Sequence, residues 1–463
     1  MSRPLVPVLV FLGMVVAVVS SLGAPLVPTI ATATHVSLSD AQWSLTITLL
    51  VGALATPTMG RLGDGPYRRQ VVLATLVVVT VGSVLSALSA PFWVLLVGRA
   101  LMGTGLGLTP LAMATARDAL TGERSRSAVS LLSVTTVAGI GLGYPLTGLI
   151  ADTIGFRAAF GFGALVSAAA FAAAFVVFPS TTEREHQRLD VLGAALLGVS
   201  VAGLLLALSE IETWSTGRLT AVVTSSVVLL ALWVRQELRC PHPLVDLRLV
   251  RTRAVLLADV TGLFAGTGMY VLLSLVIRFV QTPASAGYGF GASVVVAGLV
   301  LLPFSAMSVV ASRLTPVLAR RVSPHAVLPV GCLVFVAADV LFVLARGHLW
   351  ELFVVMGLAG LGVGATFAAL PGLIVRAVPE TETGSAMSFN QVLRYIGYSL
   401  GSALSATVLQ AHTPAGARLP GGGGYPVAAL VGAGILLLAT VLTLVLPVRR
   451  SGTAAPQAEL VEA

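Results

Sequence analysis

The chain has 463 residues, of which 56% are hydrophobic and only 10% are charged, and its formal net charge is +8. Soluble domains carry about 25% charged residues, so this composition excludes an ordinary water-soluble protein. It favours a protein with many membrane-spanning helices. Nucleic-acid binding is disfavoured as well, because the 27 basic residues are all arginines scattered between apolar runs, with no basic face or tail.

A membrane-spanning helix needs about 20 apolar residues. The first apolar run, 5–31, is longer than the core of a signal peptide and is followed by many similar runs, so we interpret it as a true span. Because lipid leaves no partner for open backbone groups and the alternation of barrel strands is absent, all spans are expected to be helices. Fourteen spans are predicted, the eighth being the shortest: 5–31, 41–60, 70–90, 92–116, 127–151, 158–178, 190–209, 219–234, 254–281, 291–311, 326–345, 350–371, 385–410 and 425–447.

The arginines predict the orientation of these spans. With the N-terminus in the cytoplasm, 20 arginines fall in inner segments, four in outer segments and three inside spans, which together account for all 27. Cytoplasmic segments of membrane proteins carry such an excess of positive charge. An even number of spans then places both termini in the cytoplasm. We expect a multi-pass protein of a cell membrane, the plasma membrane of a bacterium.

An internal repeat follows from a shift of 252 residues, which aligns GRLGDGPYRR at 60–69 with SRLTPVLARR at 312–321. Both stretches follow the second span of a six-span block if spans seven and eight are an insertion. The repeat predicts four parts of the chain. They are an N-terminal six-helix bundle at 1–180, two linker helices with inner loops at 181–253, a C-terminal six-helix bundle at 254–448 and a short cytoplasmic tail at 449–463.

The stretch 60–69 resembles the loop signature of the major facilitator superfamily. The matching residues are Gly60, Leu62, Asp64, Arg68 and Arg69, while a tyrosine replaces the second glycine of the signature. In that family the loop latches the two halves together on the cytoplasmic side. The carboxylate of Asp64, at a helix end, is suited to pair with arginines and with the positive N-terminus of a helix across the interface.

The expected latch also includes the repeated pair Arg320 and Arg321. The simpler alternative is a basic loop that only sets the topology of the chain.

Four further stretches carry the resemblance along the chain. Arg99 with GTGLGLT at 103–109 resembles the fourth-span motif of the superfamily, and AGIGLGYPLTG at 138–148 resembles its fifth-span antiporter motif. HPLVDLRL at 242–249 and GSAMSFNQVLRYIGYSLG at 384–401 resemble the fourteen-span drug:proton antiporter branch. The resemblance implies an all-α fold of two six-helix bundles plus two linker helices, with 14 transmembrane helices in total.

Buried charges mark candidate sites, because an intramembrane charge costs about 2.5–3.5 kcal/mol on insertion scales. Arg394 lies about nine residues into its span, near mid-bilayer, and Asn390 and Gln391 precede it by one turn. These three residues are predicted to line the substrate cavity. The alternative is a structural arginine that ties two helices together.

Proton coupling needs a group that changes its charge, and buried carboxylates are suited to this. The candidates are Asp339 and Asp259, with a structural ion pair as the alternative for each. The family resemblance adds Arg99. Many relatives of the fourteen-span branch carry an acid in the first span, but Val19 occupies the matching position and that span contains no charge.

The fifth predicted span contains a glycine pair and a proline. Gly139 and Gly143 are spaced so that a second helix can approach closely, and Pro145 can kink the span. We expect a hinge or a close-packed seam between the two halves. Ordinary close packing is the alternative.

These features predict a secondary transporter that exports a small amphipathic or hydrophobic compound in exchange for protons. The alternatives are a uniporter or symporter without proton antiport, and a receptor or scaffold that transports nothing. An enzyme is not expected: GYSLG at 397–401 matches a hydrolase motif but lies inside an apolar helix. No catalytic residues, metal site or cofactor are predicted. The expected partners are the small-molecule substrate, protons and lipid, with the protein a monomer.

Overall fold

The computed structural model describes residues 5–22, 26–36, 38–88, 91–179, 190–209, 214–241, 243–245, 247–250, 252–321, 326–414 and 419–445. In these segments every regular element is a helix and no strand is found. The predicted all-α class is therefore confirmed. The predicted tail at 449–463 lies outside the described residues.

The helices fall into three groups by chain order. The first half holds α1 (Leu5–Ser21), α2 (Val27–Thr34), α3 (Leu38–Asp64), α4 (Arg68–Ala87), α5 (Phe92–Gly103), η2 (Thr104–Gly107), α6 (Leu108–Ala119), α7 (Gly122–Thr153) and α8 (Phe156–Val177). The linker group holds α9 (Val191–Ser209), α10 (Thr216–Arg239) and α11 (Leu247–Val250). The second half holds α12 (Arg253–Gln281), η3 (Ala284–Ala286), α13 (Val294–Val300), α14 (Leu302–Arg321), α15 (Val327–Leu344), α16 (Leu349–Ala377), η4 (Glu380–Glu382), α17 (Thr383–Ala411) and α18 (Gly424–Val445).

Ten helices in the described part of the chain are long and apolar enough to cross a membrane, and Leu5–Val19 and Val191–Ala207 are shorter apolar helices. The helices α7 and α17 have 32 and 29 residues but are not among the ten. Fourteen spans and cytoplasmic termini stay predictions. The eighth predicted span corresponds to α10, which at 24 residues is longer than expected.

Two predicted spans are interrupted. The run 5–31 contains the two helices α1 and α2, and a short 3₁₀ turn, η2, separates α5 from α6 within the run 92–116. Gly103 ends α5 at a point where the chain touches α3. A Cβ atom on Gly103 would lie 2.5 Å from the carbonyl oxygen of Thr48. Only a glycine therefore allows α5 and α3 to pack this closely.

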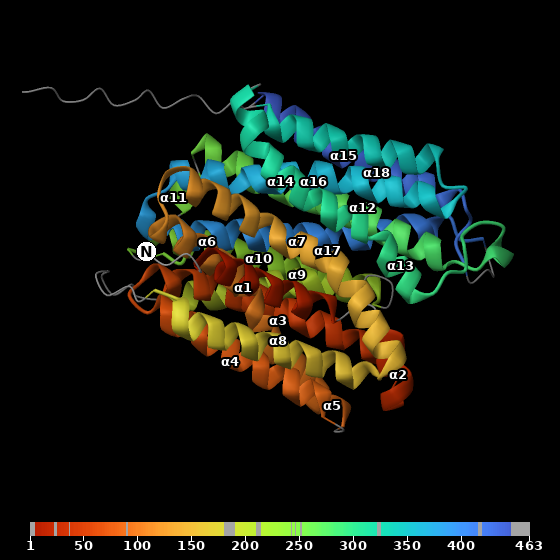
Figure 1. Ribbon diagram of the computed structural model, residues 1–463, viewed down its shortest axis with the longest axis horizontal. Coiled ribbons are helices and arrows are strands. Elements are labelled where there is room, and N and C mark those ends of the chain that lie inside the picture. Colours follow the sequence, from red (N-terminus) through yellow and green to blue (C-terminus); the bar gives the residue numbers. More distant parts are fainter. Residues whose placement is uncertain are drawn as a thin grey trace, which may run out of the picture.

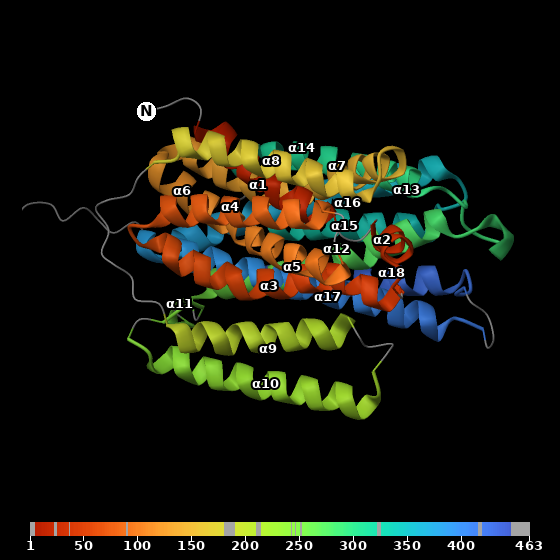
Figure 2. The same ribbon diagram turned by 90° about the horizontal axis from the view of Figure 1, so that it is seen from below.

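The long helices run side by side, with α9 and α10 set to one flank (Figures 1 and 2). The two halves meet along two seams: α7 contacts α13, α14 and α16, while α17 contacts α3 and α6. The linker helix α9 packs on both α3 and α17. We call the end where α3 finishes and α17 begins the basic end, because Arg61, Arg68 and Arg117 lie there. The other is the far end.

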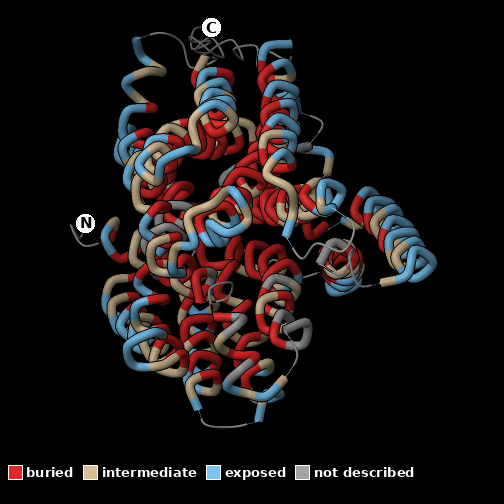
Figure 3. The backbone as a smooth tube through the Cα atoms, turned by 90° about the vertical axis from the view of Figure 1, so that its right-hand side faces the viewer, coloured by how far each residue is buried: buried red, intermediate tan, exposed pale blue. Residues whose placement is uncertain are grey.

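Buried residues lie toward the interior of the bundle and exposed residues on its outer faces (Figure 3). On α4, Val77, Val81 and Val84 are exposed, whereas Leu76 and Val79 are buried. A soluble protein rarely exposes so continuous an apolar face. The arrangement fits a bundle surrounded by lipid.

The residues of the predicted hinge divide between two interfaces. A Cβ atom on Gly139 would overlap the Ala17 methyl group, and one on Gly143 would overlap the side chain of Ser21. Both glycines thus pack α7 against α1 inside the first half, not between the halves. Pro145 does face the second half, because a Cβ atom on Gly298 of α13 would lie 2.8 Å from its nitrogen.

We expect Gly139→Ala to lower the free energy of unfolding, because the added methyl group meets Ala17, which cannot move aside. Overpacking of this kind costs about 1–3 kcal/mol. Gly161→Ala on α8 is the matched control, since a Cβ atom there has no neighbour within 4 Å. Thermal unfolding of both variants in one detergent gives the comparison. Equal melting temperatures would show that α1 and α7 do not need this close approach.

Candidate functional site

Asp64 binds the N-terminus of α17 in the opposite half. Its carboxylate accepts hydrogen bonds from the backbone N–H groups of Gly384 and Ser385, at 2.7 and 2.8 Å, and from the Ser385 hydroxyl at 2.7 Å. The residue is 1% exposed. A helix N-terminus offers unpaired N–H groups and a partial positive charge, so a carboxylate is favoured there.

Two glycines allow this contact. A Cβ atom on Gly60 would overlap the Ser388 side chain and lie 2.9 Å from the carbonyl oxygen of Gly384. A Cβ atom on Gly384 would lie 2.8 Å from the carbonyl oxygen of Gly60 and 2.5 Å from Oδ1 of Asp64. The backbones of α3 and α17 therefore meet directly at the basic end. Gly60 belongs to the latch for this steric reason.

Two arginines of the first half hold the segment just before α17. Arg61 donates from Nη1 to both carboxylate oxygens of Glu382, at 2.9 and 2.8 Å. Arg117 donates to the carbonyl oxygens of Val375 and Val378, at 2.8 and 3.1 Å, where α16 ends. A cation is favoured at a helix C-terminus, and Arg117 takes this position at the end of α16. Because Arg61 binds Glu382 just before α17, the first half contacts both ends of the α16–α17 connection.

Arg68 and Arg69 act inside the first half. Arg68 forms an ion pair with Asp118 at the end of α6 and donates to the carbonyl oxygen of Gly63 at 2.5 Å. Arg68 also lies 4.0 Å from the Asp64 carboxylate. Arg69 donates to the carbonyl oxygen of Phe175 at 2.6 Å, so it ties α4 to α8 and not to the second half.

The repeated arginine pair lies apart from these contacts. Arg320 and Arg321 are exposed at the end of α14. The latch residues that sequence reasoning missed are Arg61, Arg117 and Glu382. Arg61 stands inside the signature, directly after its first glycine, and Arg117 is one of the 20 arginines assigned to inner segments. Nothing in the sequence indicated that they face the same connection.

A second polar group lies where α7 and α17 meet. Arg394 is 2% exposed, and it donates to the Ser133 hydroxyl at 3.3 Å and the Ser133 carbonyl oxygen at 3.4 Å, across the boundary between the halves. It also donates to the Gln391 side chain at 3.2 Å, and its guanidinium carbon lies 3.8 Å from the ring centre of Phe367.

Asp259 joins this group from α12. One of its carboxylate oxygens accepts a hydrogen bond from Asn390 at 3.0 Å, and Asn390 also donates to the carbonyl oxygen of Ala258 at 3.2 Å. The structure thus brings together four predicted residues, Asp259, Asn390, Gln391 and Arg394. We call them, with Ser133 and Phe367, the central group.

The other two proton-coupling candidates lie elsewhere. Arg99 is fully buried inside the first half, where it donates to the carbonyl oxygens of Ser44 at 2.9 Å and Val19 at 3.4 Å. Asp339 is fully buried inside the second half, with one carboxylate oxygen 3.7 Å from the Cβ position of Gly432 on α18. Within the described residues, neither oxygen of Asp339 has a hydrogen-bond partner.

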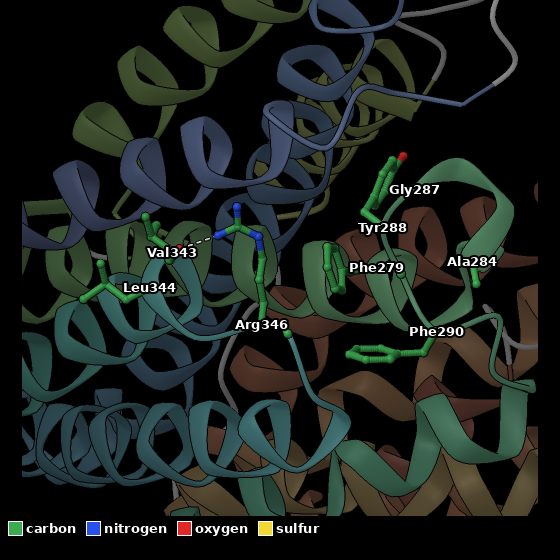
Figure 4. Close-up of a pocket in the computed structure, with 10 residues that line it drawn as sticks. Phe279, Ala284, Gly287, Tyr288, Phe290, Val343, Leu344 and Arg346 are labelled. Atoms are coloured by element: carbon green, nitrogen blue, oxygen red, sulfur yellow. Dashed lines mark hydrogen bonds between the residues drawn. The ribbon is translucent and has the colours of Figure 1, made fainter.

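A surface pocket of about 590 Å³ opens at the far end of the second half (Figure 4). Phe279, Tyr288 and Phe290 line one side, and Arg346 lies on the other. Burial raises the pKa of Tyr288 to about 12, so this phenol remains protonated and donates to the carbonyl oxygen of Pro420. All the lining residues belong to the second half, so the pocket is not the junction between the halves.

Comparisons with known proteins place these features in a family. A model of the Major Facilitator Superfamily matches residues 9–402 and 261–462. The tetracenomycin C resistance and export protein of Streptomyces glaucescens is 28% identical over 411 residues, covering 86% of this chain and 74% of the relative. The multidrug resistance protein Stp of Mycobacterium tuberculosis is 28% identical over 381 residues, covering 80% of this chain and 68% of the relative.

Two further comparisons concern the length of a relative and the fold. An uncharacterized transporter of the same superfamily from Mycobacterium tuberculosis is 29% identical over 408 residues, but this chain covers only 58% of that relative's length. The crystal structure of the human organic anion transporter MFSD10 matches with a TM-score of 0.64, covering 95% of this chain and 99% of that chain. At 20% identity this likeness shows the fold alone.

The structure is an all-helical bundle whose two halves meet at the Asp64 contact with α17 and at a buried polar junction. The chain belongs to the Major Facilitator Superfamily, and its relatives include bacterial proteins.

We expect Asp64→Asn to shift the protein toward a state that is open at the basic end. Asparagine removes the charge and turns one amide N–H₂ toward N–H donors of α17, so at least one charge-assisted hydrogen bond is lost. Such bonds contribute about 1.5–3 kcal/mol, enough to change the ratio of two states by about 10-fold or more.

The measurement is a spin–spin distance between labels on Arg124 and Arg320, which are exposed on opposite halves at the basic end. Both native cysteines are first replaced. Arg126→Gln, which removes an exposed charge at the same end, serves as the control and should leave the distances unchanged. An unaltered distance distribution in Asp64→Asn would rule out a latch held by this carboxylate.

Proposed function

We propose that the protein exports small amphipathic or hydrophobic compounds in exchange for protons, by alternating access between its two ends. The observation that carries this proposal is the central group. Arg394 of the second half bonds to Ser133 of the first half, beside the buried carboxylate of Asp259. A binding site at the junction of two halves changes its exposure whenever the halves rock against each other.

The contacts at the two ends support the alternation. At the basic end, the bonds of Asp64, Arg61 and Arg117 all cross between the halves, so they break together when that end opens. At the far end, the contact between Gly298 and Pro145 joins α13 to α7. We propose that the basic end faces the cytoplasm of a bacterial cell, in the plasma membrane, and that the protein is a monomer.

The direction and the cargo class rest on the relatives. Two of them are named for resistance or export: the tetracenomycin C protein and the multidrug resistance protein Stp. Export of amphipathic compounds also suits a junction that combines apolar walls with a few polar groups.

Among the candidates for proton coupling, the geometry favours Asp259 over Asp339. Asp259 lies next to the group that joins the halves, and one of its oxygens has no hydrogen-bond partner among the described residues. Asp339 lies between α15 and α18, away from both seams. A proton on Asp259 is therefore better placed to influence whether cargo binds.

One observation favours a uniporter or symporter instead. The position that is acidic in related antiporters is Val19, and its carbonyl oxygen accepts a hydrogen bond from Arg99. Because no carboxylate stands there, the first half has no proton carrier next to Arg99. Antiport then depends on Asp259 alone.

We expect Asp259→Asn to abolish proton-driven transport while exchange of cargo for cargo continues, because exchange needs no net proton movement. Asp339→Asn, the matched buried carboxylate, should retain proton-driven transport. Proteoliposomes with an internal pH dye and an imposed proton gradient give both rates. If proton-driven transport persists in Asp259→Asn but is lost in Asp339→Asn, the proton carrier is Asp339 instead. If the transport rate of the unaltered protein does not depend on the proton gradient, the uniporter is favoured.

A further inference from the structure

The guanidinium of Arg394 is buried without a carboxylate partner. No Asp or Glu oxygen in the described segments lies within ion-pair distance of it. Its bonds go to the neutral side chains of Ser133 and Gln391 and to a backbone oxygen, while its Nε has no acceptor. Burying a charge is costly unless it is paired, so this site favours an anion.

Another donor in the same place also lacks a partner. The hydroxyl of Tyr398 is buried and has no hydrogen-bond partner among the described residues. Together with Nε of Arg394, it makes two unused donors on α17 about one turn of helix apart. Unpaired buried donors are rare in proteins, and a ligand with negatively charged oxygens would satisfy them.

The walls around these donors are aromatic. Phe367 lies under the Arg394 guanidinium, and the rings of Tyr270 and Tyr398 are stacked with their centres 4.7 Å apart. The ring centre of Tyr395 lies 5.9 Å from that of Tyr398. Flat rings with polar edges pack well against a planar aromatic ligand.

Among the described residues, the first half meets Arg394 through Ser133, a neutral side chain. Helix α1, LVPVLVFLGMVVAVVSS, contains no carboxylate, and the charged group that contacts it is Arg99. In the central group itself, Arg394 is the charged side chain that bonds to the first half, whereas Asp259 bonds to Asn390 within the second half. A cargo at the junction of the halves would therefore contact a cation, which disfavours a cationic cargo.

We propose that the cargo of the central group is a planar aromatic compound with an acidic group, a carboxyl or a phenol, bound as the anion at Arg394. This names the substrate class of the proposed export function and rests on that function.

The proton balance agrees with exchange. On the inner side, the O–H bond of the acid breaks, its proton passes to cytoplasmic water, and the anion pairs with Arg394. When the far end opens, the anion leaves and the free oxygen of Asp259 takes up a proton from the outer side. After the return step the O–H bond on Asp259 breaks and that proton enters the cytoplasm, so one anion leaves for each proton that enters.

Three fluorescent probes with one ring system test the proposal: anthracene-9-carboxylate, its neutral carboxamide and the cationic 9-aminomethylanthracene. Uptake of each into inside-out vesicles containing the full chain is measured for the unaltered protein, Arg394→Gln and Arg394→Lys. Arg346→Gln, which alters an arginine in the surface pocket, is the matched control. Binding to purified protein by thermal shift provides a readout without transport.

We expect the carboxylate to be transported faster than the amide and the cation. Arg394→Gln should lower the carboxylate-to-amide preference by about 10-fold or more, since hydrogen bonds to a charged group contribute about 1.5–3 kcal/mol. Arg394→Lys should retain part of the preference, and Arg346→Gln all of it. If the Arg394→Gln variant does not fold, the Phe367→Leu variant is measured in its place. This variant should weaken the binding of all three anthracenes.

Two results overturn the proposal in distinguishable ways. Equal or faster transport of the cation, with thermal stabilisation by the cation and not the carboxylate, refutes the acidic cargo but leaves export intact. Absence of transport for all three probes, and for an unrelated panel of amphipathic drugs, refutes the export function itself.

Discussion

One carboxylate at the start of one helix holds the two halves together at the basic end. Asp64 satisfies two backbone N–H groups of α17, which otherwise have no partner within their own helix. The repeat does not duplicate this contact, because Pro316 stands where the second half would need an acid. The Asp64 contact is therefore one-sided: a carboxylate of the first half binds the N-terminus of α17, and the matching position of the second half carries no acid.

Much of the fold could be predicted from the sequence, because apolar run length is a direct consequence of bilayer thickness. The all-helical class, the order of the long helices and the role of Asp64 at a helix N-terminus all followed from local patterns. Breaks inside spans did not, since the 3₁₀ turn after Gly103 depends on contact with Thr48, a residue far away in the chain.

The polar sites were predictable as residues but not as partners. The position of a charge inside an apolar run singles out Arg394, Asp259 and Asp339 equally well. Which of them meet depends on the rotation of each helix about its axis, and one sequence does not define that rotation. The same limit explains why Gly139 and Gly143 were expected between the halves, although they pack α7 on α1.

The position of α9 has a consequence for how lipid-dissolved molecules approach the protein. A second apolar core joins Ala53 of α3, Val392 of α17 and Trp233 of α10 to α9, so the linker pair covers one seam between the halves. The α7–α14 seam lies on the opposite side of the bundle (Figure 2). Lipid chains therefore reach the packed α7–α14 seam directly, whereas α9 and α10 keep them away from the α3–α17 seam.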